Sequence, residues 1–334
     1  MLMFKNIILF AGLAALGAVQ PVSALTAAAF QETCAKQATS GEGQSQTTDK
    51  GWFFLKAELR HIGVGPFWGE AAAKVSKASS PDKADPLPAI VDFNDQLKAA
   101  GVELILVPVP CKAVVYADMV DPAAAGRLDD THRAFYALLR EKGVKVVDLT
   151  DLFLGKKGQG PLLYCKTDTH WSPYACELAA KAIKQQIGSP EWLKSDSSAF
   201  SSRQEARVIV GDQTEGKGSE ELMARVVSAP SGKTTVDKSS PVVLLGDSHT
   251  LVFNIGEDLH GTGAGVADQL ALELGIPIDV IGVRGSGATP ARINLLRRVK
   301  SDPGYLSGKK VLIWCFAARE FTESSGWSVL KIRQ

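Results

Sequence analysis

The chain has 334 residues, of which 45% are hydrophobic and 22% are charged. This length and composition are typical of a globular protein that buries one large core. The formal net charge is +1, and the basic residues are scattered among acidic ones. Nucleic-acid binding needs a concentrated basic face, so this class of partner is excluded.

The first 24 residues have the pattern of a signal peptide. Lys5 precedes an apolar run of 13 residues at positions 7–19, and the small residues Val22-Ser23-Ala24 provide a cleavage site. A membrane-spanning helix needs about 20 apolar residues, so the run favours a cleaved signal, with an uncleaved anchor as the alternative. We therefore expect an exported protein that is peripheral to the inner membrane at most.

Residues 25–50 are small and polar and predict a flexible lead-in, followed by one α/β domain over residues 51–334. In this domain, segments with amphipathic helical spacing alternate with short apolar strands. Glycines after helices and prolines in first turns mark the helix ends. We expect helices at 90–100, 129–142, 174–187, 266–274 and 291–300, and strands at 102–109, 144–149, 241–245, 276–283 and 309–316.

Residues 195–240 interrupt this alternation. They are rich in Ser, Thr, Gly and charged residues, with one candidate strand at 206–210, and predict a polar insertion or flap over the sheet. Elsewhere, continuous apolar strands that alternate with amphipathic helices predict a mainly parallel sheet covered on both faces. The fold class we expect is a flavodoxin-like, three-layer α/β/α domain.

Ser248 is the candidate nucleophile. It follows the apolar strand at 241–245 and the pair Gly246-Asp247, at the carboxyl edge of the sheet where α/β enzymes place their chemistry. Backbone N–H groups near this turn can face a developing oxyanion. The alternative is that Asp247 and Ser248 only cap the next helix.

Asp168 and His170 are the candidate partners of Ser248. A serine hydroxyl needs a base to take its proton and a carboxylate to orient that base. The two-residue spacing lets an extended loop aim both side chains to one side. His249 competes as the base, but it adjoins Ser248 and adjacent side chains diverge, so contact with substrate is the role we expect for it.

Other candidates lie near the same edge. The turn Gly285-Ser286-Gly287 predicts either a second oxyanion donor or an ordinary tight turn. Arg284 and Arg319 predict either binding of an anionic group or ion pairs at the surface. Three histidines have no acid partner at a suggestive spacing and predict packing or surface positions: His61, His132 and His260.

The five cysteines lack the paired spacing of a zinc site, and we expect no metal. The run Gly261-x-Gly263-x-Gly265 follows no strand, so we expect no dinucleotide and no other cofactor. Export permits disulfides. Cys165 and Cys176 are therefore candidates for a bridge that pins the loop between them, and two buried thiols are the alternative.

With these residues named, the chain resembles the periplasmic alginate O-acetyltransferase family, whose catalytic domains are SGNH-hydrolase-like. The Asp and His precede the Ser, which resembles the permuted order of this family rather than the order in ordinary SGNH hydrolases. The chain ends at Gln334, so we expect it to lack the carbohydrate-binding module that some members append. The matching strings are GWFFLKAEL at 51–59, VPVPCK at 107–112, YCKTDTHWSP at 164–173, LLGDSHT at 244–250, ADQLALELGIPIDVI at 267–281 and WCFAAREF at 314–321.

The resemblance implies a periplasmic O-acetyltransferase with Ser248 as nucleophile, His170 as base and Asp168 as the residue that orients it. It implies that an acetyl-serine passes its acetyl group to hydroxyls of an alginate-like exopolysaccharide, with acetyl supplied through a membrane-bound acyltransferase. Two alternatives remain. One is a carbohydrate acetyl-esterase with the same triad, and the other is a non-catalytic scaffold that binds polysaccharide in a secretion complex.

Overall fold

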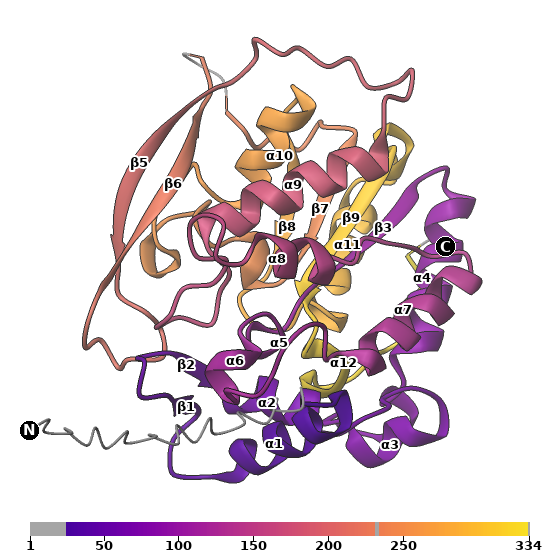
Figure 1. The fold of residues 1–334 in the computed structure, drawn as a ribbon. Helices are drawn as coiled ribbons and strands as arrows, with labels where there is room; N and C mark the ends of the chain where they lie inside the picture. Colours follow the sequence, from indigo (N-terminus) through magenta and orange to yellow (C-terminus); the bar gives the residue numbers. More distant parts are fainter. Residues whose placement is uncertain (1–24, 231–233, 333–334) are drawn as a thin grey trace, which may run out of the picture.

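The computed structural model describes residues 25–230 and 234–332, and its centre is a five-stranded parallel sheet (Figure 1). The order across the sheet is β4-β3-β9-β7-β8, and every neighbouring pair is parallel. The three inner strands are buried along almost their whole length, which explains their continuous apolar sequences. The strands are β3 (Glu103–Val109), β4 (Lys145–Val146), β7 (Val242–Gly246), β8 (Asp279–Gly282) and β9 (Val311–Ala317).

Helices cover this sheet in a three-layer α/β/α arrangement, so the fold class predicted from the sequence is confirmed (Figure 1). The α-helices are α1 (Ala27–Thr39), α2 (Lys56–Gly63), α3 (Ala72–Val75), α4 (Pro86–Ala99), α5 (Lys112–Val115), α6 (Ala117–Val120), α7 (Asp130–Glu141), α8 (Thr150–Lys156), α9 (Pro173–Ile187), α10 (Val266–Leu274), α11 (Thr289–Ser301) and α12 (Glu320–Glu323). Short 3-10 helices are η1 (Gly69–Ala71), η2 (Pro81–Lys83), η3 (Ser248–Thr250), η4 (Glu257–Leu259) and η5 (Tyr305–Gly308).

Local sequence signals set the ends of the helices that support the site. In α9, Pro173 takes the first position, and the Ser172 hydroxyl before it accepts from the Ala175 N–H at 3.2 Å. Gly188 ends this helix with a φ of 72°. All the helices and strands predicted between residues 90 and 316 are present. The largest differences are in the two edge strands, since β4 has two residues where the sequence predicts six and β8 has four where it predicts eight.

The predicted flexible lead-in at residues 25–50 is wrong. Residues 27–39 form α1, which packs against α2, and β1 (Ser45–Thr47) pairs with β2 (Phe53–Leu55). Phe30 and Cys34 lie four residues apart on one face of α1, and both are 0% exposed. The helix fits closely because a Cβ on Gly63 would lie 2.7 Å from the Ala35 nitrogen.

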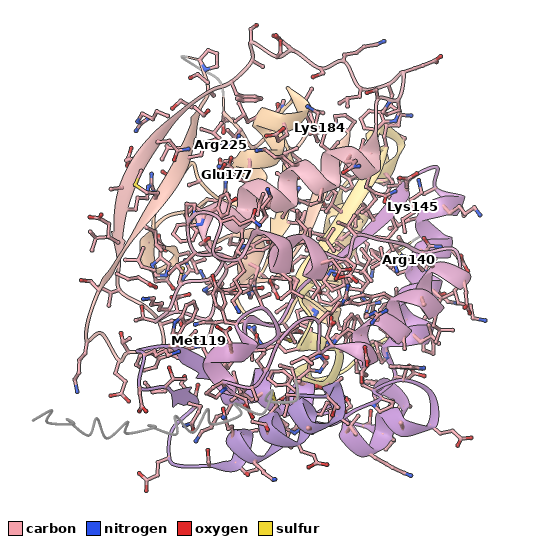
Figure 2. All side chains as sticks on the ribbon, in the orientation of Figure 1. Met119, Arg140, Lys145, Glu177, Lys184 and Arg225 are labelled. Carbon is pink, nitrogen blue, oxygen red and sulfur yellow. The ribbon has the colours of Figure 1, made fainter. Side chains whose placement is uncertain are left out.

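The insertion at residues 195–240 contains a long hairpin of β5 (Ser201–Ile209) and β6 (Glu220–Ser228). The sequence predicts one short strand here because only one side of the hairpin is apolar and buried. The hairpin lies against α9 and α10 rather than directly on the sheet. Arg225 of β6 pairs with Glu177 of α9 at 3.4 Å, and Figure 2 shows both side chains between the two elements.

The predicted signal peptide, residues 1–24, lies outside the described residues. Among the helices that the structure does describe, none combines the length and hydropathy needed to cross a bilayer.

The burial of Phe30 gives a test of whether α1 belongs to the folded domain. We expect Phe30→Ala to lower the free energy of unfolding by about 3–5 kcal/mol, because a fully buried ring leaves a cavity. Urea unfolding of the purified chain measures this change. Glu32→Ala, on the exposed side of the same helix, should change the value by less than about 0.5 kcal/mol. Equal stability of the two variants would contradict the packing of α1.

Candidate active site

Ser248 lies where β7 leaves the sheet and η3 begins. Gly246 is required at the end of the strand, because a Cβ there would lie 1.7 Å from the Cys315 carbonyl oxygen of the neighbouring strand. Asp247 is 1% exposed, and its carboxylate accepts from the His249 N–H at 2.9 Å and from the Ala317 N–H at 2.7 Å. Asp247 thus caps η3 and ties the end of β7 to the end of β9, which leaves the Ser248 hydroxyl at the sheet edge.

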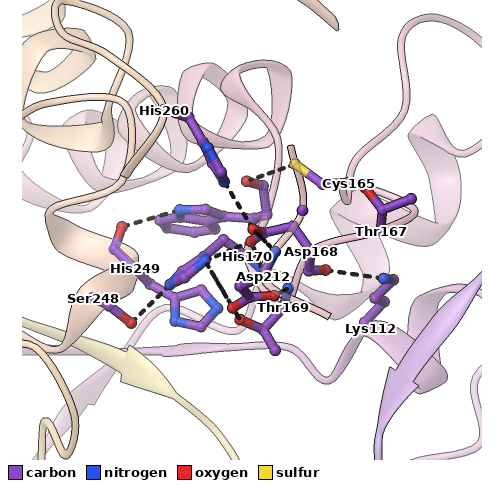
Figure 3. A network of polar contacts seen from close by, with 12 residues as sticks. Lys112, Cys165, Thr167, Asp168, Thr169, His170, Asp212, Ser248, His249 and His260 are labelled. Atoms are coloured by element: carbon purple, nitrogen blue, oxygen red, sulfur yellow. Dashed lines mark hydrogen bonds and ion pairs between the residues drawn. The ribbon is translucent and has the colours of Figure 1, made fainter. Parts of the chain in front are cut away.

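The structure brings Ser248, His170 and Asp168 together (Figure 3). The Ser248 Oγ lies 2.8 Å from His170 Nε2, and His170 Nδ1 lies 2.6 Å from Asp168 Oδ1. The carboxylate fixes the tautomer, because Nδ1–H donates to Asp168 and leaves Nε2 to accept the serine proton. The hydroxyl, imidazole and carboxylate therefore have the order and spacing that nucleophilic catalysis needs.

The loop that carries Asp168 and His170 is held from several sides. An isolated bridge pairs Tyr164 with Trp171 at its base, and the Trp171 indole N–H donates to the His249 carbonyl oxygen at 3.0 Å. Lys112 is 2% exposed, and its Nζ donates to the carbonyl oxygens of Lys166 and Asp168 at 3.0 Å each. Burial lowers the pKa of Lys112 to about 8. These contacts fix the loop against the residue that follows Ser248.

Asp168 is fully buried and accepts four hydrogen bonds. Oδ1 accepts from the His170 backbone N–H at 2.9 Å as well as from its ring. Oδ2 accepts from the Asp212 N–H at 2.9 Å and from His260 Nε2 at 2.8 Å. Burial alone would raise the pKa of Asp168, but the bonds from His170 and His260 outweigh it and hold that pKa well below its usual range. The carboxylate therefore stays ionised beside His170.

His260 is the residue that the sequence misses, and the expectation that it lacks an acid partner is wrong. It stands 92 residues after Asp168, in a left-handed backbone conformation with a φ of 64°. Burial lowers the pKa of His260, but the bond to Asp168 and that carboxylate's charge exceed this effect, so the net shift is upward. No local spacing signals the contact, since only the folded loop at residues 256–265 brings His260 to the carboxylate.

Asp212 reaches the site from the turn of the β5–β6 hairpin. Besides its N–H bond to Asp168, its carboxylate accepts from the Thr169 N–H at 2.8 Å and from the Thr169 hydroxyl. The neighbouring Gly211 allows this approach, because a Cβ there would lie 2.0 Å from the Thr167 carbonyl oxygen. The insertion predicted as a flap thus supplies part of the wall around Asp168.

His249 lies below the loop rather than in the cleft. Its ring is buried, 4.9 Å from the His170 ring and 5.9 Å from the Trp171 ring between centroids, and its Nδ1 is 3.3 Å from Asp247 Oδ1. Burial lowers the pKa of His249 more than Asp247 raises it. The ring is therefore neutral and packed, which corrects the expected role as a substrate contact.

The turn Gly285-Ser286-Gly287 lies beside the residue before Ser248. A Cβ on Gly287 would lie 3.0 Å from the Asp247 nitrogen, and Gly285 has a φ of 107°, so this turn requires both glycines. Trp314 Nε1 donates to the Gly287 carbonyl oxygen at 2.8 Å, and the Ser286 hydroxyl donates to Glu320. Within the described residues, neither the Ser248 N–H nor the Gly287 N–H donates a hydrogen bond. Both donors are therefore available, one on Ser248 itself and the other in the turn beside Asp247.

The two arginines have different surroundings. Arg284 forms ion pairs with Glu257 at 2.9 Å and Asp258 at 2.7 Å, as the surface alternative predicts. Arg319 is half-buried, and although burial opposes its charge, Asp247 and Glu58 raise its pKa overall. The Arg284 guanidinium is therefore already paired with two carboxylates.

The predicted bridge between Cys165 and Cys176 is not formed, because all five cysteines are free and buried. The Cys165 thiol donates to the Trp171 carbonyl oxygen at 3.8 Å. Cys176 lies on α9, which packs against α10, and burial followed by the charge of Asp268 raises the pKa of its thiol. The two sulfurs thus serve different contacts, and the alternative of buried thiols is correct.

Two groups of side chains in the described residues have donor atoms close enough to share a metal ion. His61, His132 and Cys111 form one, but His61 Nε2 is already 2.7 Å from His132 Nε2, and its Nδ1 is 2.8 Å from the Thr322 hydroxyl. Burial lowers the pKa of both rings, so a neutral, hydrogen-bonded pair explains them. The packing role predicted for His61 and His132 is confirmed.

The other group is Asp168, His170 and Asp212, whose bonds are described above.

A cleft of about 620 Å³ opens beside Ser248 and His170. The hairpin lines one side with Val208 and Val210, which are 67% and 49% exposed. The loop after η3 and the loop after β8 line the other sides, with Glu257, Asp258, His260 and Arg284. The Ser248 hydroxyl is therefore open to a substrate of the size of a few sugar rings.

Comparison with known proteins identifies the family. A family model described as "SGNH hydrolase-like domain, acetyltransferase AlgX" matches residues 46–318. A curated relative, "Probable alginate O-acetylase AlgJ" of Pseudomonas putida, is 27% identical over 245 residues, which cover 68% of this chain and 60% of the relative. "Alginate biosynthesis protein AlgX" of the same organism is 25% identical over 242 residues, covering 67% of this chain and 49% of that protein. The chain thus spans about half to three fifths of the length of these relatives.

Solved structures agree in fold. The O-acetyltransferase domain of Pseudomonas putida AlgJ superposes with a TM-score of 0.62 at 22% identity, covering 84% of this chain and 93% of that one. Pseudomonas aeruginosa AlgX gives a TM-score of 0.58 at 19% identity, covering 85% of this chain and 65% of that one. The SGNH-hydrolase-like fold and the resemblance read from the sequence are confirmed. Since the family model covers most of the chain, this protein belongs to the family of AlgX-type, SGNH hydrolase-like acetyltransferase domains.

Proposed function

We propose that this protein is an O-acetyltransferase that uses Ser248 as nucleophile, His170 as general base and Asp168 as the residue that orients the base. The observation that carries this proposal is the 2.8 Å contact between the Ser248 Oγ and His170 Nε2, with Asp168 on the opposite ring nitrogen. The names of the relatives, which include an alginate O-acetylase, support acetyl transfer to a polysaccharide. The buried, ionised Asp168 stabilises the imidazolium that forms when His170 takes a proton.

The reaction has two steps. The Ser248 Oγ gives its proton to His170 Nε2 and attacks the carbonyl carbon of an acetyl ester. The bond to the leaving alcohol then breaks, and that alcohol takes the proton, which leaves acetyl-Ser248. A sugar hydroxyl next gives its proton to His170 and attacks the acetyl carbon. The acetyl group moves to the sugar, and Ser248 leaves with the proton.

The tetrahedral oxyanion in both steps needs donors. The Ser248 N–H and the Gly287 N–H are the candidates, because both lie at the sheet edge and donate to no described residue. Trp314, which binds the Gly287 carbonyl oxygen, and Glu320, which accepts from Ser286, hold the turn in place. Loss of one such donor costs about 3–4 kcal/mol of transition-state stabilisation.

Two alternatives use the same surface. An exported carbohydrate esterase would pass the acetyl group to water, and the names of the relatives favour transfer over this reaction. A non-catalytic polysaccharide-binding scaffold would not need the relay, and the ordered contacts among Ser248, His170 and Asp168 disfavour it. The signal peptide predicted at residues 1–24 and the family resemblance support a periplasmic location, with acetyl supplied through a membrane-bound acyltransferase.

The nucleophile is tested by Ser248→Ala. We expect the rate of acetyl transfer from a surrogate ester to fall by about 10⁴-fold or more, because no other group can form the ester. A fluorophosphonate should label the wild-type chain at Ser248 and not the variant. The exposed Ser301→Ala serves as the control and should keep both rate and labelling. Wild-type rates in the Ser248→Ala protein would remove the mechanism, and unlabelled Ser248 in a folded sample would favour the scaffold.

The second histidine on Asp168 is tested by His260→Ala. We expect kcat/KM to fall by about 10- to 100-fold, because a hydrogen bond to a charged group contributes about 1.5–3 kcal/mol. His260→Gln keeps an N–H donor of similar reach and should recover most of the loss. The Gln variant should also change the shape of the acid limb of the pH profile, since it removes one titrating group. A purely structural role predicts instead that both variants lose activity in proportion to stability.

The anchor of the oxyanion turn is tested by Glu320→Gln. Burial and then the nearby Asp247 raise the pKa of Glu320 to about 7. This pKa in the folded protein lies above the ordinary glutamate value of 4.5. The protonated form therefore stabilises the fold fully below about pH 4.5, and this stabilisation is lost as pH rises through 7. Urea unfolding from pH 4 to 8 should show the wild type losing up to about 3 kcal/mol relative to the variant. Parallel pH curves for the two proteins would contradict a raised pKa.

A further inference from the structure

Acidic side chains dominate the loops around the proposed catalytic cleft. Three segments bound it: residues 208–212 with Gly216 in the hairpin, residues 257–260 in and after η4, and Arg284 after β8. The chain as a whole has a net charge of +1, so this excess of acid is local. The residues that line the cleft include four carboxylates, Asp168, Asp212, Glu257 and Asp258, against Arg284 and His260, and His260 is paired with Asp168.

The arginine at the rim does not offset this charge for an incoming ligand. Arg284 is already paired with Glu257 and Asp258, at 2.9 and 2.7 Å. These two carboxylates are 78% and 64% exposed, so they face the solvent from which a substrate arrives. A cleft lined by one sign of charge repels ligands of that sign and concentrates the opposite sign.

Negative charge also lies close to the reacting atoms. Asp212 lies 3.9 Å from His170 Nδ1 and is 43% exposed. The cations beneath the site do not line the cleft, because Lys112 binds backbone carbonyl oxygens and Arg319 is half-buried near Asp247. A sugar carboxylate held near Ser248 would therefore meet negative charge and find no unpaired cation among the lining residues.

The remaining wall of the cleft suits an uncharged sugar face. Val208 and Val210 line it from the hairpin and are 67% and 49% exposed. Aliphatic side chains of this kind pack against the C–H faces of a pyranose ring, while the carboxylates accept hydrogen bonds from its hydroxyls. The lining thus offers apolar contact and hydrogen-bond acceptors.

We propose that the acetyl acceptor of this site is a glycan without carboxylates, and that uronic-acid polymers are poor acceptors. The inference rests on the proposed function, because it assigns the acceptor for acetyl-Ser248. It differs from the polymer named for the relatives, since alginate is a polyuronate with a carboxylate on each sugar. The shared chemistry of the acceptors we expect is a hydroxyl-rich sugar chain that is neutral or carries amines.

Acceptor competition tests this inference. The purified chain is given a surrogate acetyl ester and one of three oligosaccharides of equal length, made of mannose, of partly deacetylated chitin or of mannuronate. At low ionic strength, kcat/KM for the mannuronate oligomer should be about tenfold or more below that of the better of the other two. Added salt should narrow the difference, because it screens exposed charges. The amine-bearing arm separates a neutral acceptor from a cationic one.

Mass spectrometry of Ser248 in the same reactions distinguishes failure of the proposed acceptor from failure of the proposed function. Acetyl-Ser248 together with a preference for mannuronate, in EDTA or with added Ca²⁺, overturns this inference and leaves the proposed function intact. Acetyl-Ser248 that passes to neither of the other oligomers also overturns it. Absence of acetyl-Ser248 overturns both.

A matched pair of variants tests whether the carboxylates at the cleft cause the discrimination against mannuronate. Asp258→Asn removes a rim carboxylate that is 64% exposed and paired with Arg284. Asp130→Asn removes a carboxylate that is 66% exposed and paired with Arg133 on α7, outside the cleft. The ratio of kcat/KM for mannuronate over mannose should rise about two- to fivefold in the first variant and stay unchanged in the second. Equal ratios in the two variants would contradict an electrostatic selection at the cleft.

Discussion

The buried carboxylate of Asp168 joins three separate segments of the chain. A buried charge is costly unless its oxygens are fully hydrogen-bonded, and here four donors meet it. Two come from His170 in the same loop, one from Asp212 in the hairpin turn and one from His260 after η3. The positions of the imidazole, of the hairpin and of the loop at residues 256–265 are therefore set together. If the hairpin turn or the loop at residues 256–265 moved away, the buried Oδ2 would lose one of its two donors.

The layers of the fold could be predicted from the sequence because they depend on periodicity. Buried parallel strands need continuous apolar runs, and the covering helices need one apolar face, so both leave a local pattern. The α1 helix has only two fully buried anchors, Phe30 and Cys34, within a small and polar stretch, and this is too little signal to predict it. The hairpin was missed for a related reason, since its outer face is polar and exposed.

The residues of the candidate site also differ in whether the sequence predicts them. The catalytic candidates could be predicted from the sequence because their residue types and local spacing are typical of a triad: Ser248, His170 and Asp168. His260 and Asp212 could not, because their contacts with Asp168 exist only after the chain has closed on itself. The bridge expected between Cys165 and Cys176 relied on closeness in sequence, while the thiols face different partners. Family membership and the fold do not determine which sugar polymer accepts the acetyl group, because substrate choice depends on the side chains of the site rather than on the fold.

The five free, buried thiols have a consequence for how this protein can be handled and observed. Each sulfur is held in the fold by packing rather than by a disulfide. Burial also raises the pKa of each sulfur and keeps alkylating reagents away from it. Reaction of these sulfurs with a chromogenic disulfide reagent would then proceed only when a segment opens. Three of these sulfurs would report the opening of different layers of the molecule: Cys34 on the buried face of α1, Cys165 in the His170 loop and Cys315 in the central strand.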